Sequence, residues 1–195
     1  MGNLFSTTNE GDNSVLSKNA EAYVQNGIPI EAVSLRCEAF RLMNEAKEAS
    51  RHSQLEYQSG NKSQAKLLSI NKNNLYIQMN EKNQQAAELI FKHFNQNRSN
   101  DVIDLHGLYV TEALKYVEDR LNRCRLENRS QLTIITGMGN NSPNKIPKIK
   151  PQVEEFVRRN NLKVTYYNGH IVIDLSINDE NKIINDRNSN ECIIL

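Results

Sequence analysis

The sequence predicts an α/β protein, in which a long N-terminal helical hairpin is followed by a β-α-β-α-β-β mixed four-stranded sheet with helices packed on it. Three observations predict this class. Apolar residues recur at helical spacing across residues 30–97. From about Asp101 onward, short β-rich runs alternate with helical segments. Near the end, Asn168-Gly169 separates two such runs, which predicts a type I′ hairpin.

The hairpin is predicted as two long helices around a short turn. Pro29 opens the first helix and Gly60 follows its C-terminal end. Asn61 caps the second helix, which is expected to reach about Phe94. Helical spacing places the apolar face of the first helix at Val33, Cys37, Phe40, Met43 and Ala46. It places the apolar side of the second at Leu67, Leu68, Leu75, Ile77, Met79, Ala86, Leu89, Ile90 and Phe94.

The sheet is predicted from four short runs of strand-forming residues. A helix over 110–125, with Thr111 as its N-cap, links the first two strands and makes them parallel. A second helix over 149–160 leads to two final strands, which are antiparallel. The strands are expected at 102–105, 131–136, 163–167 and 170–175.

Composition narrows the class of protein. The chain has 195 residues, with 24 basic and 23 acidic side chains and a net charge of +1, which excludes a polycation that holds nucleic acid by bulk charge alone. No apolar run approaches the roughly 18 residues of a membrane-spanning helix, and no secretory signal follows Met1. The 3 cysteines include no CxxC pair, so we expect a reduced, cytoplasmic chain without a disulfide framework or a zinc site.

Both ends of the chain carry a lipidation pattern. The first six residues fit N-myristoylation of Gly2, and the last four fit a C-a-a-X box that directs geranylgeranylation of Cys192. Two lipids give the stable anchoring that one myristoyl chain does not, so we expect a tether to the cytoplasmic face of a membrane. The expected organisation is a flexible arm at 1–29, a helical hairpin domain at 30–98, an α/β domain at 101–177 and a flexible arm at 178–195.

Asp104 and His106 are the candidate catalytic residues. They lie two positions apart at the end of the first strand, so both point to one side while Ile103 and Leu105 point to the other. A carboxylate that orients an imidazole and raises its pKa is the basic pair for general acid–base chemistry. Gly107 allows a sharp turn afterwards. By spacing alone, a structural histidine at a strand end is the more common interpretation.

A glycine-rich turn after the second strand is the candidate phosphate-binding element. Thr136, Gly137 and Gly139 are expected at the same carboxyl edge of the parallel strands as the Asp–His pair. Backbone N–H groups in such a turn can bind an anion, although an isolated T-G-x-G is more often only a turn. Cations beside the turn, which can hold a phosphate backbone, are Lys145, Lys148 and Lys150.

In combination, these motifs resemble the Smr (small MutS-related) domain. The resemblance covers about residues 101–177 and includes the closing hairpin. Its motifs are Asp104-Leu105-His106-Gly107, Thr136-Gly137-Met138-Gly139 and Ile149-Lys150-Pro151-Gln152-Val153. The upstream segment resembles the small helical domain that often precedes Smr in eukaryotic proteins, at residues 35–39, 60–68 and 79–91.

The resemblance implies an α/β sandwich that binds nucleic acid and, in several members, cleaves it. It makes Asp104 and His106 the cleavage residues and turns the loop from Thr136 to Gly139 toward phosphate. The partner it implies is RNA, including ribosome-bound mRNA, with DNA less favoured. No cofactor is assigned. Asp104 could instead help to hold a divalent metal, but one carboxylate is a poor cage for such an ion.

The chain departs from the family pattern at the loop, which leaves other functions open. Met138 stands where active members often carry Lys or Arg, and Asn141 replaces a frequent histidine. Loss of a loop cation removes charge stabilisation of the transition state. One alternative is therefore a non-catalytic adaptor that binds RNA or the ribosome. Another is a membrane-tethered interaction module whose working surface is the helical hairpin.

Overall fold

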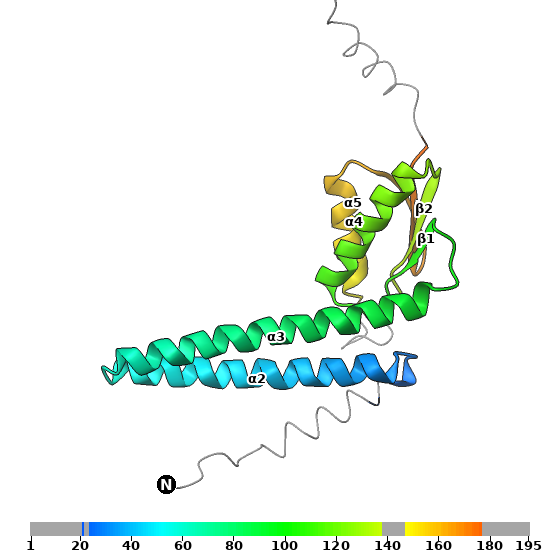
Figure 1. The fold of residues 1–195 in the computed structure, drawn as a ribbon. Coiled ribbons are helices and arrows are strands. Elements are labelled where there is room, and N and C mark those ends of the chain that lie inside the picture. The colour runs from blue at the N-terminus through cyan, green and yellow to red at the C-terminus, as the bar shows by residue number, and fades with distance from the viewer. Residues whose placement is uncertain (1–20, 22–23, 138–146, 177–195) are drawn as a thin grey trace, which may run out of the picture. The chain divides into compact units, whose positions relative to one another are not determined.

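A pair of long helices and a four-stranded sheet make up the computed structural model, which describes residues 21, 24–137 and 147–176 (Figure 1). The chain divides into two compact units, Met1–His93 and Phe94–Leu195. Within the described residues, no helix combines the length and apolar character needed to cross a bilayer. The lipidation candidates Gly2 and Cys192 lie outside the described residues.

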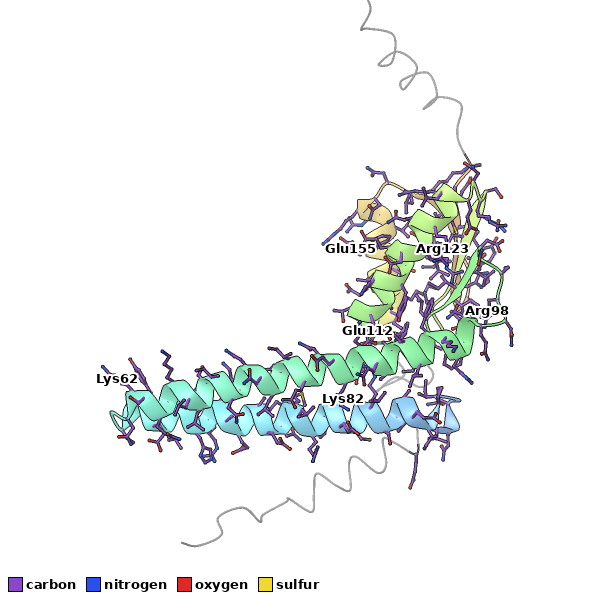
Figure 2. The ribbon with its side chains drawn as sticks, viewed as in Figure 1. Lys62, Lys82, Arg98, Glu112, Arg123 and Glu155 are labelled. Carbon is purple, nitrogen blue, oxygen red and sulfur yellow. The ribbon has the colours of Figure 1, made fainter. Side chains whose placement is uncertain are left out.

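The first unit contains α2 (Ile30–Gln58) and most of α3 (Lys62–Asn95), which run side by side (Figure 1). Pro29 immediately precedes α2, as predicted, and Gly60 in the connecting turn has a φ of 85°. Two polar links join the helices. The guanidinium of Arg36 donates to Asn83 Oδ1 at 2.8 Å, and Lys82 Nζ lies 2.7 Å from Glu38 Oε2 (Figure 2).

The buried faces of these helices differ from the predicted ones, because small residues form much of them. The predicted residues Leu67, Ile77 and Leu89 are exposed. An alanine side chain ends at Cβ and lets a partner helix lie close, whereas a reading of the sequence gives most weight to large apolar residues. The buried residues of α2 are Ala32, Val33, Arg36, Ala39, Leu42, Ala46 and Ala49. Those of α3 are Ala65, Ala86, Ala87 and Ile90.

The second unit is the predicted β-α-β-α-β-β arrangement, and its mixed sheet confirms the α/β fold class. The strand order is β1-β2-β4-β3, with β1 parallel to β2 and the other pairs antiparallel. The last strand therefore lies between the second and the third. The elements are β1 (Val102–Asp104), α4 (Val110–Leu126), β2 (Gln131–Ile135), α5 (Ile149–Arg159), β3 (Lys163–Tyr166) and β4 (His170–Asp174).

Two local predictions in this unit are wrong. The N-cap of α4 is Tyr109, whose extended backbone lets its N–H donate to the Glu112 carboxylate at 2.8 Å, so Thr111 already lies inside the helix. The turn between β3 and β4 is not of type I′, which needs a positive φ at both central residues. Gly169 has a φ of 85°, whereas Asn168 is not among the residues with positive φ.

The helices α4 and α5 contact each other and cover one face of the sheet (Figure 1). The core between these layers is apolar, and its fully buried strand residues are Ile103, Leu132, Ile134, Ile171 and Ile173. Because strand side chains alternate, their neighbours Asp104, Ile135 and His170 point to the opposite face. The strand register aligns these three residues in one row across β1, β2 and β4. We call the surface around this row the site face.

Candidate functional site

Asp104 and His106 form the pair that the sequence predicted. Asp104 ends β1, and its Oδ1 accepts a hydrogen bond of 2.5 Å from His106 Nδ1 and one of 3.0 Å from the His106 backbone N–H. The Asp104 side chain is only 4% exposed, whereas that of His106 is 44% exposed. The buried carboxylate therefore fixes an imidazole that solvent and a ligand can reach. Since the carboxylate engages Nδ1, the free nitrogen of the neutral ring is Nε2.

Two residues that the sequence reasoning missed hold Asp104 in place. Arg98 Nη2 lies 2.5 Å from Asp104 Oδ2, and Figure 2 labels Arg98 just past the C-terminal end of α3. The side chain of Asn95 bonds both backbone groups of Asp104, with Nδ2 donating to the carbonyl at 2.9 Å and Oδ1 accepting from the N–H at 2.8 Å. Asn95 thus gives the edge strand β1 the hydrogen bonds that a neighbouring strand would supply.

The sequence offered a weak signal for these two residues. Both are polar, and both fall between the predicted end of the second helix and the first strand, less than ten residues from Asp104. Nothing in the spacing distinguishes them from ordinary linker residues. The ring of Phe94 adds an apolar neighbour, with its centroid 6.1 Å from that of His106.

The pair shifts the pKa of both members. Burial raises the pKa of Asp104, but hydrogen bonds from the His106 side chain and backbone, together with the charges of His106 and Arg98, outweigh burial and hold it below its ordinary value. The hydrogen bond to Asp104 raises the pKa of His106 above its ordinary value, against burial and the Arg98 charge. The imidazole is therefore a stronger base than a free histidine, which suits a general base.

Asp104 does not fit the alternative role of a metal ligand. Its two oxygens already accept hydrogen bonds from Arg98 and His106, and the side chain is almost completely buried. A hard divalent cation takes six or more oxygen ligands, several of them carboxylates or waters. Among the described residues there is no group of three His, Cys, Asp or Glu side chains arranged to hold a metal ion.

Gly137 lies directly against the His106 ring. It has a φ of 74°, in the left-handed region that favours glycine. A Cβ built on Gly137 would lie 2.8 Å from His106 Nε2 and 3.2 Å from Cδ2. Any other residue would press on the nitrogen that faces away from Asp104. The loop and the Asp–His pair therefore meet at one place, as the sequence predicted.

The described part of the loop does not offer its N–H groups to an anion. The backbone N–H groups of Thr136 and Gly137 both donate to the carbonyl of Gly169, at 3.0 and 3.1 Å. The Thr136 hydroxyl also lies 3.4 Å from this carbonyl. Thr136 and Gly137 therefore tie the loop to the β3–β4 turn. Gly139 and Lys145, also predicted to bind phosphate, lie outside the described residues.

The β3–β4 turn brings further groups to the site face. Lys150, at the start of α5, donates from Nζ to the carbonyl of Tyr167 at 3.2 Å. The rings of Tyr167 and His170 are stacked, with centroids 4.5 Å apart and planes 7° from parallel. Lys148 is exposed just before α5. Two of the predicted phosphate-binding lysines are thus described, and one of them is bonded to the turn.

Comparison with known proteins identifies both parts of the chain. Residues 103–171 match the family model of the Smr domain, and residues 33–95 match that of a domain of unknown function, DUF1771.

Two yeast proteins and one solved structure are similar to this chain. An endonuclease named NBR9 from Saccharomyces cerevisiae is 40% identical over 114 residues, which are 58% of this chain and 48% of that protein. An Smr domain-containing protein of Schizosaccharomyces pombe is 35% identical over 115 residues, which are 59% of this chain and 54% of that protein. The solution structure of the B3BP Smr domain, 31% identical, covers 49% of this chain and 98% of its own, with a TM-score of 0.40. This chain thus spans about half the length of the curated relatives it matches.

Proposed function

Because this chain is an Smr-domain protein in which a DUF1771 region precedes the Smr domain, we propose that it binds nucleic acid and cleaves RNA as an endonuclease. The substrate class we propose is mRNA or ribosome-associated RNA. The printed name of the yeast relative, an endonuclease, supports the reaction class. The observation that carries the proposal is the half-exposed His106, held by a buried Asp104 and faced by a glycine.

In the proposed reaction, His106 acts through Nε2. It takes the proton of the ribose 2′-hydroxyl, whose oxygen attacks the adjacent phosphorus, and the bond from phosphorus to the 5′-oxygen breaks. The leaving oxygen takes up a proton, and the products are a 2′,3′-cyclic phosphate and a 5′-hydroxyl. Asp104 orients the ring and stabilises its protonated form, and the absent Cβ at Gly137 leaves room beside Nε2.

Charge on the reacting phosphate requires cations, because the N–H groups of Thr136 and Gly137 are already bonded. Arg98 contacts Asp104 Oδ2 and is about one-third exposed, which places a guanidinium next to the pair. Lys148 and Lys150 stand at the start of α5, where they can hold the phosphate backbone of a bound strand. These three side chains are the cations we assign to the substrate.

Cleavage assays with matched histidine variants test this proposal. Purified wild-type chain is incubated with single-stranded and structured RNA, beside His106→Ala and the control His52→Ala. His52 is exposed on α2, so its loss should leave cleavage unchanged. Loss of the general base should reduce the rate by about 100-fold or more. Equal cleavage by wild type and His106→Ala would contradict the proposed role of His106.

A second candidate function is a non-catalytic RNA- or ribosome-binding adaptor. The observation that favours it is the hydrogen bonding of the loop, since two N–H groups that would face a phosphorane donate to Gly169 instead. Met138 adds to this, because it supplies no charge where active members often have a cation. This function predicts RNA binding at low salt without cleavage by the wild-type chain.

We further propose, from the end motifs alone, lipidation of Gly2 and Cys192 and a location on the cytoplasmic face of a membrane. Intact-mass measurement of the chain made in eukaryotic cells reads both modifications at once. The unmodified mass would rule out the tether.

A further inference from the structure

The stacked rings of Tyr167 and His170 have no role in the reaction proposed above. Tyr167 ends the turn side of β3 and is 48% exposed, although most of a tyrosine ring is apolar. Its backbone N–H donates to the His170 carbonyl at 3.0 Å, and its own carbonyl accepts from Lys150. The backbone that carries the ring is therefore fixed at both polar groups, and a flat apolar surface is left at the site face.

The register fixes where this pair lies relative to the catalytic candidates. Asp104, Ile135 and His170 form one row, so His170 is two strands away from Asp104. With neighbouring strands about 4.8 Å apart, the row spans about 10 Å. The turn is also tied to Gly137 through the Gly169 carbonyl, and Gly137 touches His106. The two rings thus belong to the same rigid edge as the imidazole.

We propose that the Tyr167–His170 pair is a stacking site for an unpaired base next to the phosphate that His106 attacks. This inference rests on the proposed function, and it names the substrate class as RNA that is single-stranded at the cleavage point. Every base has a π-face, so stacking on an aromatic side chain tolerates any sequence. A base within a duplex has both faces covered by its neighbours and cannot occupy the site.

The chain provides a matched control for this pair. Tyr166 precedes Tyr167 and is 51% exposed, so the two tyrosines differ little in chemistry or in exposure. Tyr166 pairs with Ile171, whose side chain is buried beneath the helices, and so it points to the face opposite the site. Replacement of Tyr166 therefore removes an equally exposed ring without touching the site face.

Fluorescence anisotropy at low salt tests the proposal with a short single-stranded RNA and a fully paired RNA hairpin. Tyr167→Ala should weaken binding of the single strand by about tenfold, while Tyr167→Phe and Tyr166→Ala bind as wild type does. Affinity for the paired RNA should not change. Equal loss on both RNAs, or no loss on either, would overturn the stacking site while the proposed function stands. No RNA binding by the wild-type chain would overturn the proposed function itself.

A second measurement needs no variant. A fluorescent purine analogue is placed at successive positions of the single strand and titrated with wild-type chain. Stacking on a ring quenches such a base, so quenching should be confined to one position beside the cleaved phosphate. Absence of quenching at every position, despite binding, would show that the rings only stabilise the turn.

Discussion

Gly137 approaches His106 so closely that the first atom of any side chain would lie 2.8 Å from Nε2. That nitrogen is the one the Asp104 carboxylate leaves free. The glycine therefore has a chemical role in addition to its backbone conformation, because it keeps the reactive side of the imidazole open.

Replacement of this glycine separates the two roles. Gly137→Ala should lower the cleavage rate by at least about tenfold, since its Cβ displaces the ring, and should cost about 1–2 kcal/mol of folding free energy for the positive φ. Cleavage kinetics and urea unfolding measure the two effects. Gly60→Ala is the matched control, because Gly60 has a φ of 85° and nothing within 4 Å of its Cβ position. A similar loss of cleavage in both variants would mean that only stability matters.

The charge on Asp104 sets the basicity of His106. Asp104→Asn should lower the pKa of His106, because the bond that raises it is lost while burial and the Arg98 charge remain. The limb of the pH–rate profile on which His106 loses its proton should move to lower pH, with a lower maximum rate. NMR titration of the imidazole measures the pKa, with Asp119→Asn, which changes an exposed residue of α4, as control. An unchanged pKa would contradict the coupling.

The same pair makes stability depend on pH. The raised pKa of His106 adds stability below its ordinary value of about 6.5, and this is lost as pH rises through the raised pKa. The lowered pKa of Asp104 adds stability above its ordinary value of about 3.9, and this is lost as pH falls through the lowered pKa. Urea unfolding of wild type and Asp104→Asn should therefore differ most between about pH 4 and 6.5. A difference independent of pH would refute this linkage.

Asn95 should be worth more to stability than an exposed asparagine. Asn95→Ala removes both hydrogen bonds to the buried Asp104 backbone and should destabilise the second unit by about 1–3 kcal/mol. Asn160→Ala, which removes one exposed hydrogen bond to Phe156, should cost about 0.5 kcal/mol or less. Chemical unfolding followed by circular dichroism compares the two. Equal costs would mean that the edge of β1 does not need Asn95.

The lysines near α5 should act on RNA through charge. Neutralising Lys148 or Lys150 as Gln should reduce the slope of log affinity against log salt by about 0.7 for each phosphate contact with a single strand. Lys62→Gln, at the start of α3, is the control and should leave the slope unchanged. Anisotropy titrations between low and moderate salt provide the slopes. Slopes equal to that of wild type would remove these lysines from the RNA-binding surface.

Element types and limits in the second unit could be predicted from the sequence, because each short element carries its own periodicity. The strand order could not, since nothing local indicates that β4 pairs with β2 as well as with β3. In the first unit, large apolar side chains misled the prediction, and Leu67 and Ile77 are exposed while alanines are buried.

At the site, the sequence could predict what lies within one motif. The alternation of Asp104 and His106 with two core residues was enough to place them together. Arg98 and Asn95 could not be identified, because their contacts depend on how the end of α3 meets the edge of β1. The use of the Thr136 and Gly137 N–H groups by Gly169 joins residues more than thirty positions apart, which no local pattern reports.

The clamp formed by Asn95 and Arg98 has a consequence for where a working nuclease fragment can begin. The Smr match starts at residue 103, yet the two side chains that restrain Asp104 come before it. A truncation placed at the motif's own border would keep every signature residue and still release the acidic partner of the imidazole. The smallest autonomous unit therefore starts inside the last turn of the preceding helix.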